Sequence, residues 1–218
     1  MVTNDELHDL LYSIPKDVDY TTIIEELDFQ DMPPERINKL LDIINHENFF
    51  KFHDTLKAAG ILCSIGIDKG FEYIKDLILN KKYNKDWRGD LSDEDYEYLL
   101  NVIKSYLTSQ STFGNEAKAR EKIYPCVREI IRLSKVKKIS ISRFYWIIDE
   151  MKYDEYIPLI KDYLMYIIRD YNDRYWDIYD ASSLLLKLDP KFVIGLFNRN
   201  NLLLRDFKLS ISNLTNNQ

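Results

Sequence analysis

The chain has 218 residues, a formal net charge of −6 and a sequence pI of about 5.2. This acidic balance argues against a nucleic-acid binder, because that class concentrates lysine and arginine on one face. Hydrophobic residues make up 45% and charged residues 30% of the chain, as in a globular domain that buries a core without disulfides. Only 6 glycines and 6 prolines occur, which disfavours a loop-rich β protein.

The N-terminal sequence MVTNDELHDLLYSI lacks the basic start and apolar run of a signal peptide. No stretch reaches the ~18 uninterrupted apolar residues of a membrane helix. We therefore expect a cytoplasmic protein that does not associate with a membrane. Cys63 and Cys126 both lie on apolar stripes, so we expect buried free thiols, with a disulfide as the alternative.

Residues 1–47 predict three short helices. The first carries Leu7, Leu10 and Leu11 and ends before Pro15. The second is expected over residues 19–27. The third opens at Pro33-Pro34, since proline suits a first helical turn. We expect these helices to form an irregular N-terminal cap.

Residues 49–79 give the clearest pattern, two helices joined by a tight turn at residues 66–68. Asn48 is expected to cap the first helix, Gly66 to take the left-handed turn that ends it, and Asp68 to cap the second. Helices this short are unstable alone in water, so each must bury its apolar stripe against a neighbour. The stripe of the first helix comprises Phe49, Phe52, Leu56, Ala59 and Cys63.

After a polar loop at residues 81–90, the pattern stays helical. Ser92 followed by Asp95 predicts a capping box. Pro125 is expected either to kink the helix over residues 116–133 or to begin a new one. Further helices are expected from Ser140, Asp154, Asp173 and Asp189-Pro190, and a last one over residues 202–209. With about eleven helical segments and no convincing strand, the fold class is all-α.

Two segments, beginning at Lys57 and Tyr179, share one scheme. Each has a helix with a central alanine, a leucine-rich end, a turn with aspartate and a second amphipathic helix. The matching residues are Ala58, Ala59, Asp68, Ala181, Asp189 and Pro190. This scheme resembles HEAT repeats. The resemblance implies an irregular HEAT-like α-α superhelix, or solenoid, in which residues 1–218 form one domain: a cap (1–47), stacked helix pairs (48–209) and a polar tail (210–218).

In size, charge and composition the chain is similar to bacterial immunity proteins of toxin–immunity systems, including contact-dependent growth inhibition. That resemblance implies a non-enzymatic, monomeric protein-binding module without a cofactor. It would occlude the active site of a basic, nuclease-like toxin domain in a 1:1 complex. Two alternatives stay open: a general HEAT-like scaffold in a regulatory complex, and a HEAT-like DNA glycosylase.

Two acidic and aromatic patches are candidate partner-binding sites, because aromatic side chains anchor partners and carboxylates steer basic ones. The alternative for the first patch is that its acidic residues only stabilise a helix N-terminus. The first patch comprises Asp86, Trp87, Asp90, Asp93, Glu94, Asp95 and Tyr98.

The second patch comprises Asp173, Trp176, Asp177 and Asp180, and its aspartates are spaced by four and three residues on one helical face. Trp176 with Asp180 is similar to the aromatic and acidic residues in the cleft of certain HEAT-like DNA glycosylases, but that resemblance also implies more basic neighbours to hold phosphates. Zinc-ligand spacing, a glycine-rich phosphate loop and a nucleophile elbow are all missing from the sequence. We therefore expect no catalytic, cofactor or metal residue.

Overall fold

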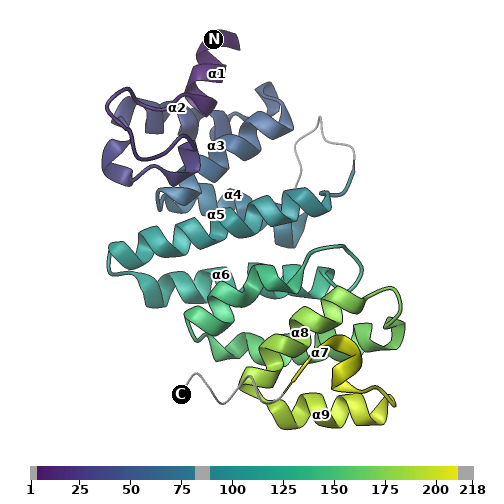
Figure 1. Cartoon of the computed structure of the whole chain (residues 1–218). Coiled ribbons are helices and arrows are strands. Elements are labelled where there is room, and N and C mark those ends of the chain that lie inside the picture. Colours follow the sequence, from purple (N-terminus) through teal and green to yellow (C-terminus); the bar gives the residue numbers. More distant parts are fainter. Residues whose placement is uncertain (1–3, 82–88, 211–218) are drawn as a thin grey trace. The chain divides into compact units, whose positions relative to one another are not determined.

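The structure, a computed structural model, describes residues 4–81 and 89–210. Every regular element in these ranges is a helix and none is a strand, which confirms the all-α prediction (Figure 1). Contacts divide the chain into two compact units, Met1–Val127 and Arg128–Gln218. The superhelix and the single domain over residues 1–218 stay predictions.

The first unit is built around α3, which contacts α1, α2, α4 and α5. Ten of its thirteen residues are buried, so its apolar surface extends around most of the helix. The elements of this unit are α1 (Asn4–Tyr12), η1 (Ile24–Glu26), η2 (Phe29–Asp31), α2 (Pro34–Asn45), η3 (Glu47–Phe49), α3 (Phe52–Ser64), α4 (Asp68–Asn80), α5 (Asp93–Thr112) and the first part of α6 (Glu116–Leu133).

The turn between α3 and α4 forms as predicted. Gly66 has φ +84°, and the next amide, of Ile67, donates to the Leu62 carbonyl at 2.8 Å. These features satisfy the last carbonyls of α3. Asp68 is not the cap of α4, however, because Ile67 occupies that position. The Asp68 carboxylate instead accepts hydrogen bonds from Tyr106 and Lys122.

The predicted start of α3 is wrong. Residues 47–49 form a separate 3-10 turn, Phe50 is extended, and α3 begins at Phe52 after Lys51. Asn48 therefore does not cap α3. Phe49 falls outside the helical phase and is 83% exposed rather than buried.

The helix expected over residues 19–27 is also wrong, because only the single turn η1 forms there. The Thr21 hydroxyl accepts from the Ile23 amide at 3.0 Å and donates to Glu26 at 2.8 Å. Such local side-chain hydrogen bonds offer the backbone an alternative to a helix. The proline start of α2 is confirmed.

Two predictions, the capping box of α5 and the effect of Pro125 on α6, can be compared with the structure directly. The capping box is confirmed: Ser92 Oγ accepts from the Asp95 amide at 3.1 Å, and Asp95 Oδ2 accepts from the Ser92 amide at 2.9 Å. α6 continues through Pro125, so no new helix begins there. The missing N–H of Pro125 would have bonded to the carbonyl of Glu121, which lies at the exposed surface.

The second unit is built around α8, which contacts α7, α9, η4 and η8. Asp189 caps α9 as predicted, since its Oδ1 accepts from the Phe192 amide at 3.1 Å. Its elements are the end of α6, η4 (Ile141–Phe144), the π-helix η5 (Trp146–Glu150), η6 (Asp154–Tyr156), α7 (Ile157–Ile167), η7 (Ile168–Asp170), α8 (Tyr175–Leu188), α9 (Pro190–Arg199) and η8 (Leu204–Phe207).

Three predicted helices of this unit differ in the structure. Ser140 is an N-cap as expected, but it opens a 3-10 turn followed by a π-helix. α8 begins at Tyr175 rather than Asp173. The expected helix over residues 202–209 is one 3-10 turn, η8.

Candidate protein-binding surface

Trp176 is the most exposed aromatic residue of α8, with 67% of its surface accessible. Its ring makes edge-on contacts with Tyr175, at 5.2 Å between ring centroids, and with Tyr179, at 5.9 Å. Tyr175 in turn stacks on Phe207 of η8 at 5.1 Å. Such edge-on aromatic contacts are stabilising, so they favour this orientation of the exposed indole.

Asp180 lies one helical turn after Trp176. Its Oδ2 accepts a 3.3 Å hydrogen bond from Ser140, the cap of η4, and no lysine or arginine in the described part of the chain pairs with it. Burial and the nearby charge of Asp177 raise the pKa of Asp180, and the Ser140 hydrogen bond opposes this. The protein thus keeps a half-buried carboxylate without a cation.

Asp177 is neutralised to a greater degree than Asp180. Arg174 Nη1 lies 3.1 Å from its Oδ2, and Arg174 Nη2 donates to the carbonyls of Ser134 and Lys135 after α6. Burial still raises the pKa of Asp177 against the effect of Arg174. Asp177 therefore lies at the edge of the acidic surface and is linked through Arg174 to the segment after α6.

Tyr163 of α7 places a hydroxyl close to these carboxylates. The residue is fully buried, and its hydroxyl has no hydrogen-bond partner within residues 4–81 and 89–210. Burial, followed by the charge of Asp177, raises the pKa of Tyr163. α7, which packs against α8, therefore carries a buried hydroxyl without a hydrogen-bond partner in the described ranges.

We define the α8 surface as Trp176, Tyr179 and Asp180, with Asp177 at its edge. The structure thus brings three of the four predicted residues of the second patch together on one helix. Asp173 lies in the turn before α8 and is exposed. The spacing of three residues from Trp176 could have indicated Tyr179. Ser140 and Tyr163 come from other elements and have no signal in the local sequence.

The described acidic members of the first predicted patch lie at the start of α5 or just before it, and two of them are engaged within the chain. Asp95 is used in the capping box, and Asp90 lies 3.8 Å from Lys81. Glu94 is exposed, and Asp93 lies in the first turn of α5. Asp86 and Trp87 lie outside the described residues.

Tyr98 is engaged inside the first unit, because its hydroxyl points inward and donates to Glu25 at 3.0 Å. Lys57 meets the same carboxylate oxygen at 2.5 Å. Burial and the charge of Glu25 raise the pKa of Tyr98 well above its ordinary value. These three residues line a pocket of about 550 Å³. The Glu25 carboxylate of η1 binds Lys57 of α3 and Tyr98 of α5 there, so these contacts connect the three elements.

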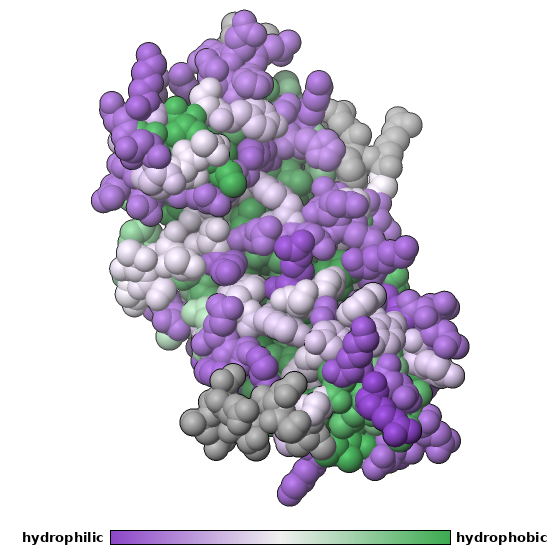
Figure 2. Space-filling model, viewed as in Figure 1, coloured by the Kyte–Doolittle hydropathy of each residue, from purple (hydrophilic) through white to green (hydrophobic). Residues whose placement is uncertain are grey.

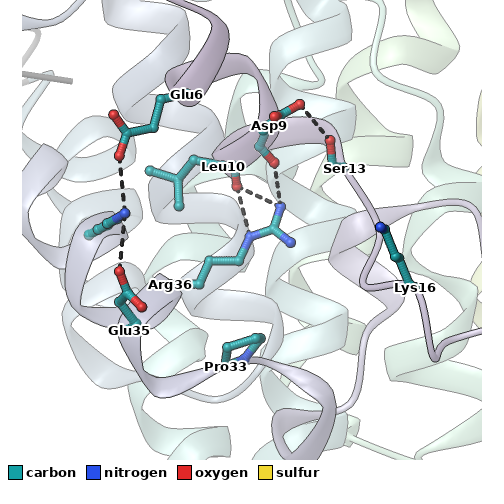
Figure 3. A pocket seen from close by; sticks show the side chains of 9 residues that line it. Glu6, Asp9, Leu10, Ser13, Lys16, Pro33, Glu35 and Arg36 are labelled. Atoms are coloured by element: carbon teal, nitrogen blue, oxygen red, sulfur yellow. Dashed lines mark hydrogen bonds and ion pairs between the residues drawn. The ribbon is translucent and has the colours of Figure 1, made fainter. Parts of the chain in front are cut away.

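A second pocket, of about 490 Å³, lies between α1 and α2 (Figure 3). Arg36 Nη2 donates to the carbonyls of Asp9 and Leu10, at 2.9 and 2.7 Å, in the last turn of α1. A cation at this end of a helix is favourable. Lys39 lies 3.0 Å from Glu6 and 3.3 Å from Glu35. The charged groups therefore bind one another and fasten α1 to α2.

Hydrophilic residues dominate the face drawn in Figure 2, and hydrophobic ones gather over α9 and the segment after it. A pocket of about 390 Å³ lies there, lined mainly by Ile194, Phe197 and Leu202–Leu204.

Within the described ranges, no three His, Cys, Asp or Glu side chains lie close enough to hold a metal ion. No helix of the described chain combines the length and apolarity needed to cross a bilayer.

Searches with known family models, among characterised proteins and among solved structures find no match to this chain. The α8 surface offers aromatic faces beside a carboxylate that lacks a cation, and this combination suits the binding of a positively charged group.

Proposed function

We propose that this chain is a protein-binding module that holds a basic partner on the α8 surface. The observation that carries the proposal is that α8 has an exposed Trp176 and, one turn later, Asp180 without a cation among the described residues. Tryptophan is enriched among the residues that dominate binding energies, and carboxylates steer basic partners to a surface. The neighbouring tyrosines hold the indole in place, which reduces the entropy lost on binding.

The specific role that we propose is that of an immunity protein. A chain with net charge −6 complements a basic toxin domain, such as a nuclease, and a module of this size can cover an active site. The proposed mechanism is occlusion in a 1:1 complex in the cytoplasm, without catalysis by this chain. Support comes from the charge of the chain and from the unpaired carboxylate of the α8 surface.

The test is co-expression of the full chain with the product of the gene directly upstream, followed by purification of the complex. We expect a 1:1 complex whose association rate falls as salt is added, because the attraction is screened. Trp176→Ala should weaken binding by about 30-fold, the range of a central aromatic anchor. Asp154→Asn, at the start of η6, is the matched control and should leave binding unchanged.

Two outcomes would count against the proposal. A complex with the same affinity after Trp176→Ala would exclude the α8 surface. Release of bases from damaged DNA by the purified chain alone would instead favour the glycosylase alternative.

A further inference from the structure

We propose that the α8 surface recognises an arginine side chain of the partner and prefers it to lysine. This inference rests on the proposed function and names the chemistry of the same site. It follows from the geometry of Trp176 and Asp180 together with the partners that already hold each of them.

Trp176 and Asp180 are four residues apart on α8. Residues four apart on a helix have neighbouring side chains, with Cβ atoms about 5–6 Å apart, so the indole of Trp176 and the carboxylate of Asp180 share one patch. A guanidinium group is planar and carries donors along its edge, so it can stack on an aromatic ring while donating to a carboxylate. The compact ammonium of lysine does not combine the two contacts as well.

One oxygen of the Asp180 carboxylate is held by Ser140. Ser140 Oγ donates to Oδ2 of Asp180, and the same Ser140 oxygen lies 2.7 Å from Ser142 Oγ. Oδ1 of Asp180 receives no hydrogen bond from the part of the chain that the structure describes. One oxygen is thus held by the protein and the other is left to accept from a visiting donor, which is a preorganised arrangement.

The protein already has cations nearby, Arg174 and Lys187. Arg174 is held by Asp177 and by the carbonyls of Ser134 and Lys135, and its side chain is 19% exposed. Lys187 lies on the same side of α8 as Asp180 but is 2.7 Å from Asp149. Both are engaged elsewhere, so neither of them supplies a cation to Asp180.

The experiment uses the full chain and three short peptides of glycine and serine that differ only at one central residue: arginine, lysine or citrulline. Citrulline keeps the shape of arginine and lacks its charge. Binding is followed by NMR at the indole N–H of Trp176, assigned with the Trp176→Phe variant. We expect the arginine peptide to shift this signal with an affinity about fivefold higher than the lysine peptide, and citrulline to bind far more weakly.

Asp180→Asn should weaken binding of the arginine peptide by about tenfold, and Asp154→Asn should not change it. Equal binding of the arginine and lysine peptides, or a missing response to all three, would overturn the arginine preference. Either result would leave the proposed function standing if Trp176→Ala still weakens the partner complex. A partner complex insensitive to Trp176→Ala would overturn the proposed function itself.

Discussion

Gly60 in α3 makes room for Tyr98 of α5. A Cβ atom at position 60 would lie 2.0 Å from Tyr98 Oη and 2.9 Å from Cζ, closer than real contacts allow. Replacing glycine by alanine inside a helix ordinarily stabilises a protein by about 1 kcal/mol. Here the overpacking cost of about 1–3 kcal/mol should exceed that gain. We expect Gly60→Ala to lower the free energy of unfolding, as measured by urea denaturation.

The matched control is Gly195→Ala in α9, where a Cβ atom would have no neighbour within 4 Å. We expect this variant to be more stable than the parent by roughly 0.5–1 kcal/mol. Equal stability of the two variants would show that Tyr98 moves aside without cost.

Asp180 should act against stability at neutral pH. Its pKa is raised in the folded chain, so the free energy of unfolding falls as pH rises through the interval between the unfolded and folded pKa values. Asp180→Asn removes this effect. Because the group is half exposed and screened, we expect a rise in Tm of only about 1–2 °C at pH 7. The gain should vanish below about pH 4, where the unfolded carboxyl is also protonated.

This measurement is calorimetry of both proteins across that pH range. Higher Tm together with weaker partner binding is the pattern of a residue kept for function at the expense of stability. A lower Tm for Asp180→Asn would mean that the carboxylate serves the fold, and the case for the α8 surface would weaken.

Arg174 joins two helices of the second unit. It donates to the carbonyls of Ser134 and Lys135 beyond the end of α6 and pairs with Asp177 of α8. Arg174→Ala leaves these acceptors without partners, so we expect a loss of about 2–3 kcal/mol in the free energy of unfolding. Arg174→Lys should recover part of it, since lysine keeps the charge and lacks the fork.

Urea denaturation measures these losses, and Arg132→Ala supplies the comparison. Arg132 pairs with Glu129 on an exposed helix surface, a contact worth less than about 1 kcal/mol. Similar losses for Arg174→Ala and Arg132→Ala would contradict the role of Arg174 as a link between helices.

At the level of elements, local chemistry predicted the caps Ser92, Ser140 and Asp189, failed for Asn48 and Asp68, and missed the irregular turns. Ser92 and Asp189 cap α5 and α9 because each side chain reaches an amide within three residues, which a sequence displays directly. The 3-10 turn at residues 24–26 has the local hydrogen bonds of Thr21 and also packs on α3 and α5, and the turn at 204–207 packs on α8. Periodicity alone therefore predicted helices where only single turns form.

The candidate site shows the same division. Helical spacing placed Trp176, Asp177 and Asp180 together, and the structure confirms that they share α8. The direction in which Tyr98 points could not be predicted, because it depends on Gly60 and Glu25 from two other elements.

At the level of the whole molecule, the all-α class was predictable because apolar stripes recur at helical spacing along the chain. The division into Met1–Val127 and Arg128–Gln218 was not, since the boundary falls inside α6, two residues after Pro125, and the helix continues through both positions. Packing between distant helices decides it, and no local pattern records that packing.

The position of the cysteines relative to this boundary has a practical consequence. Cys63 and Cys126 are free and fully buried, both in the first unit, and burial raises the pKa of Cys126 to about 12. Because thiol reagents need an accessible thiolate, labelling should proceed only when this unit opens. The chain has no other cysteine, so the rate of thiol labelling measures how often the first unit opens.

Since α6 is unbroken from Glu116 to Leu133, we expect the two halves to open cooperatively. Saturating the α8 surface with a partner should then slow the modification of thiols that lie in the other half. An unchanged labelling rate would mean that the two units open independently. The two native cysteines are sufficient for this measurement, so no engineered probe is needed.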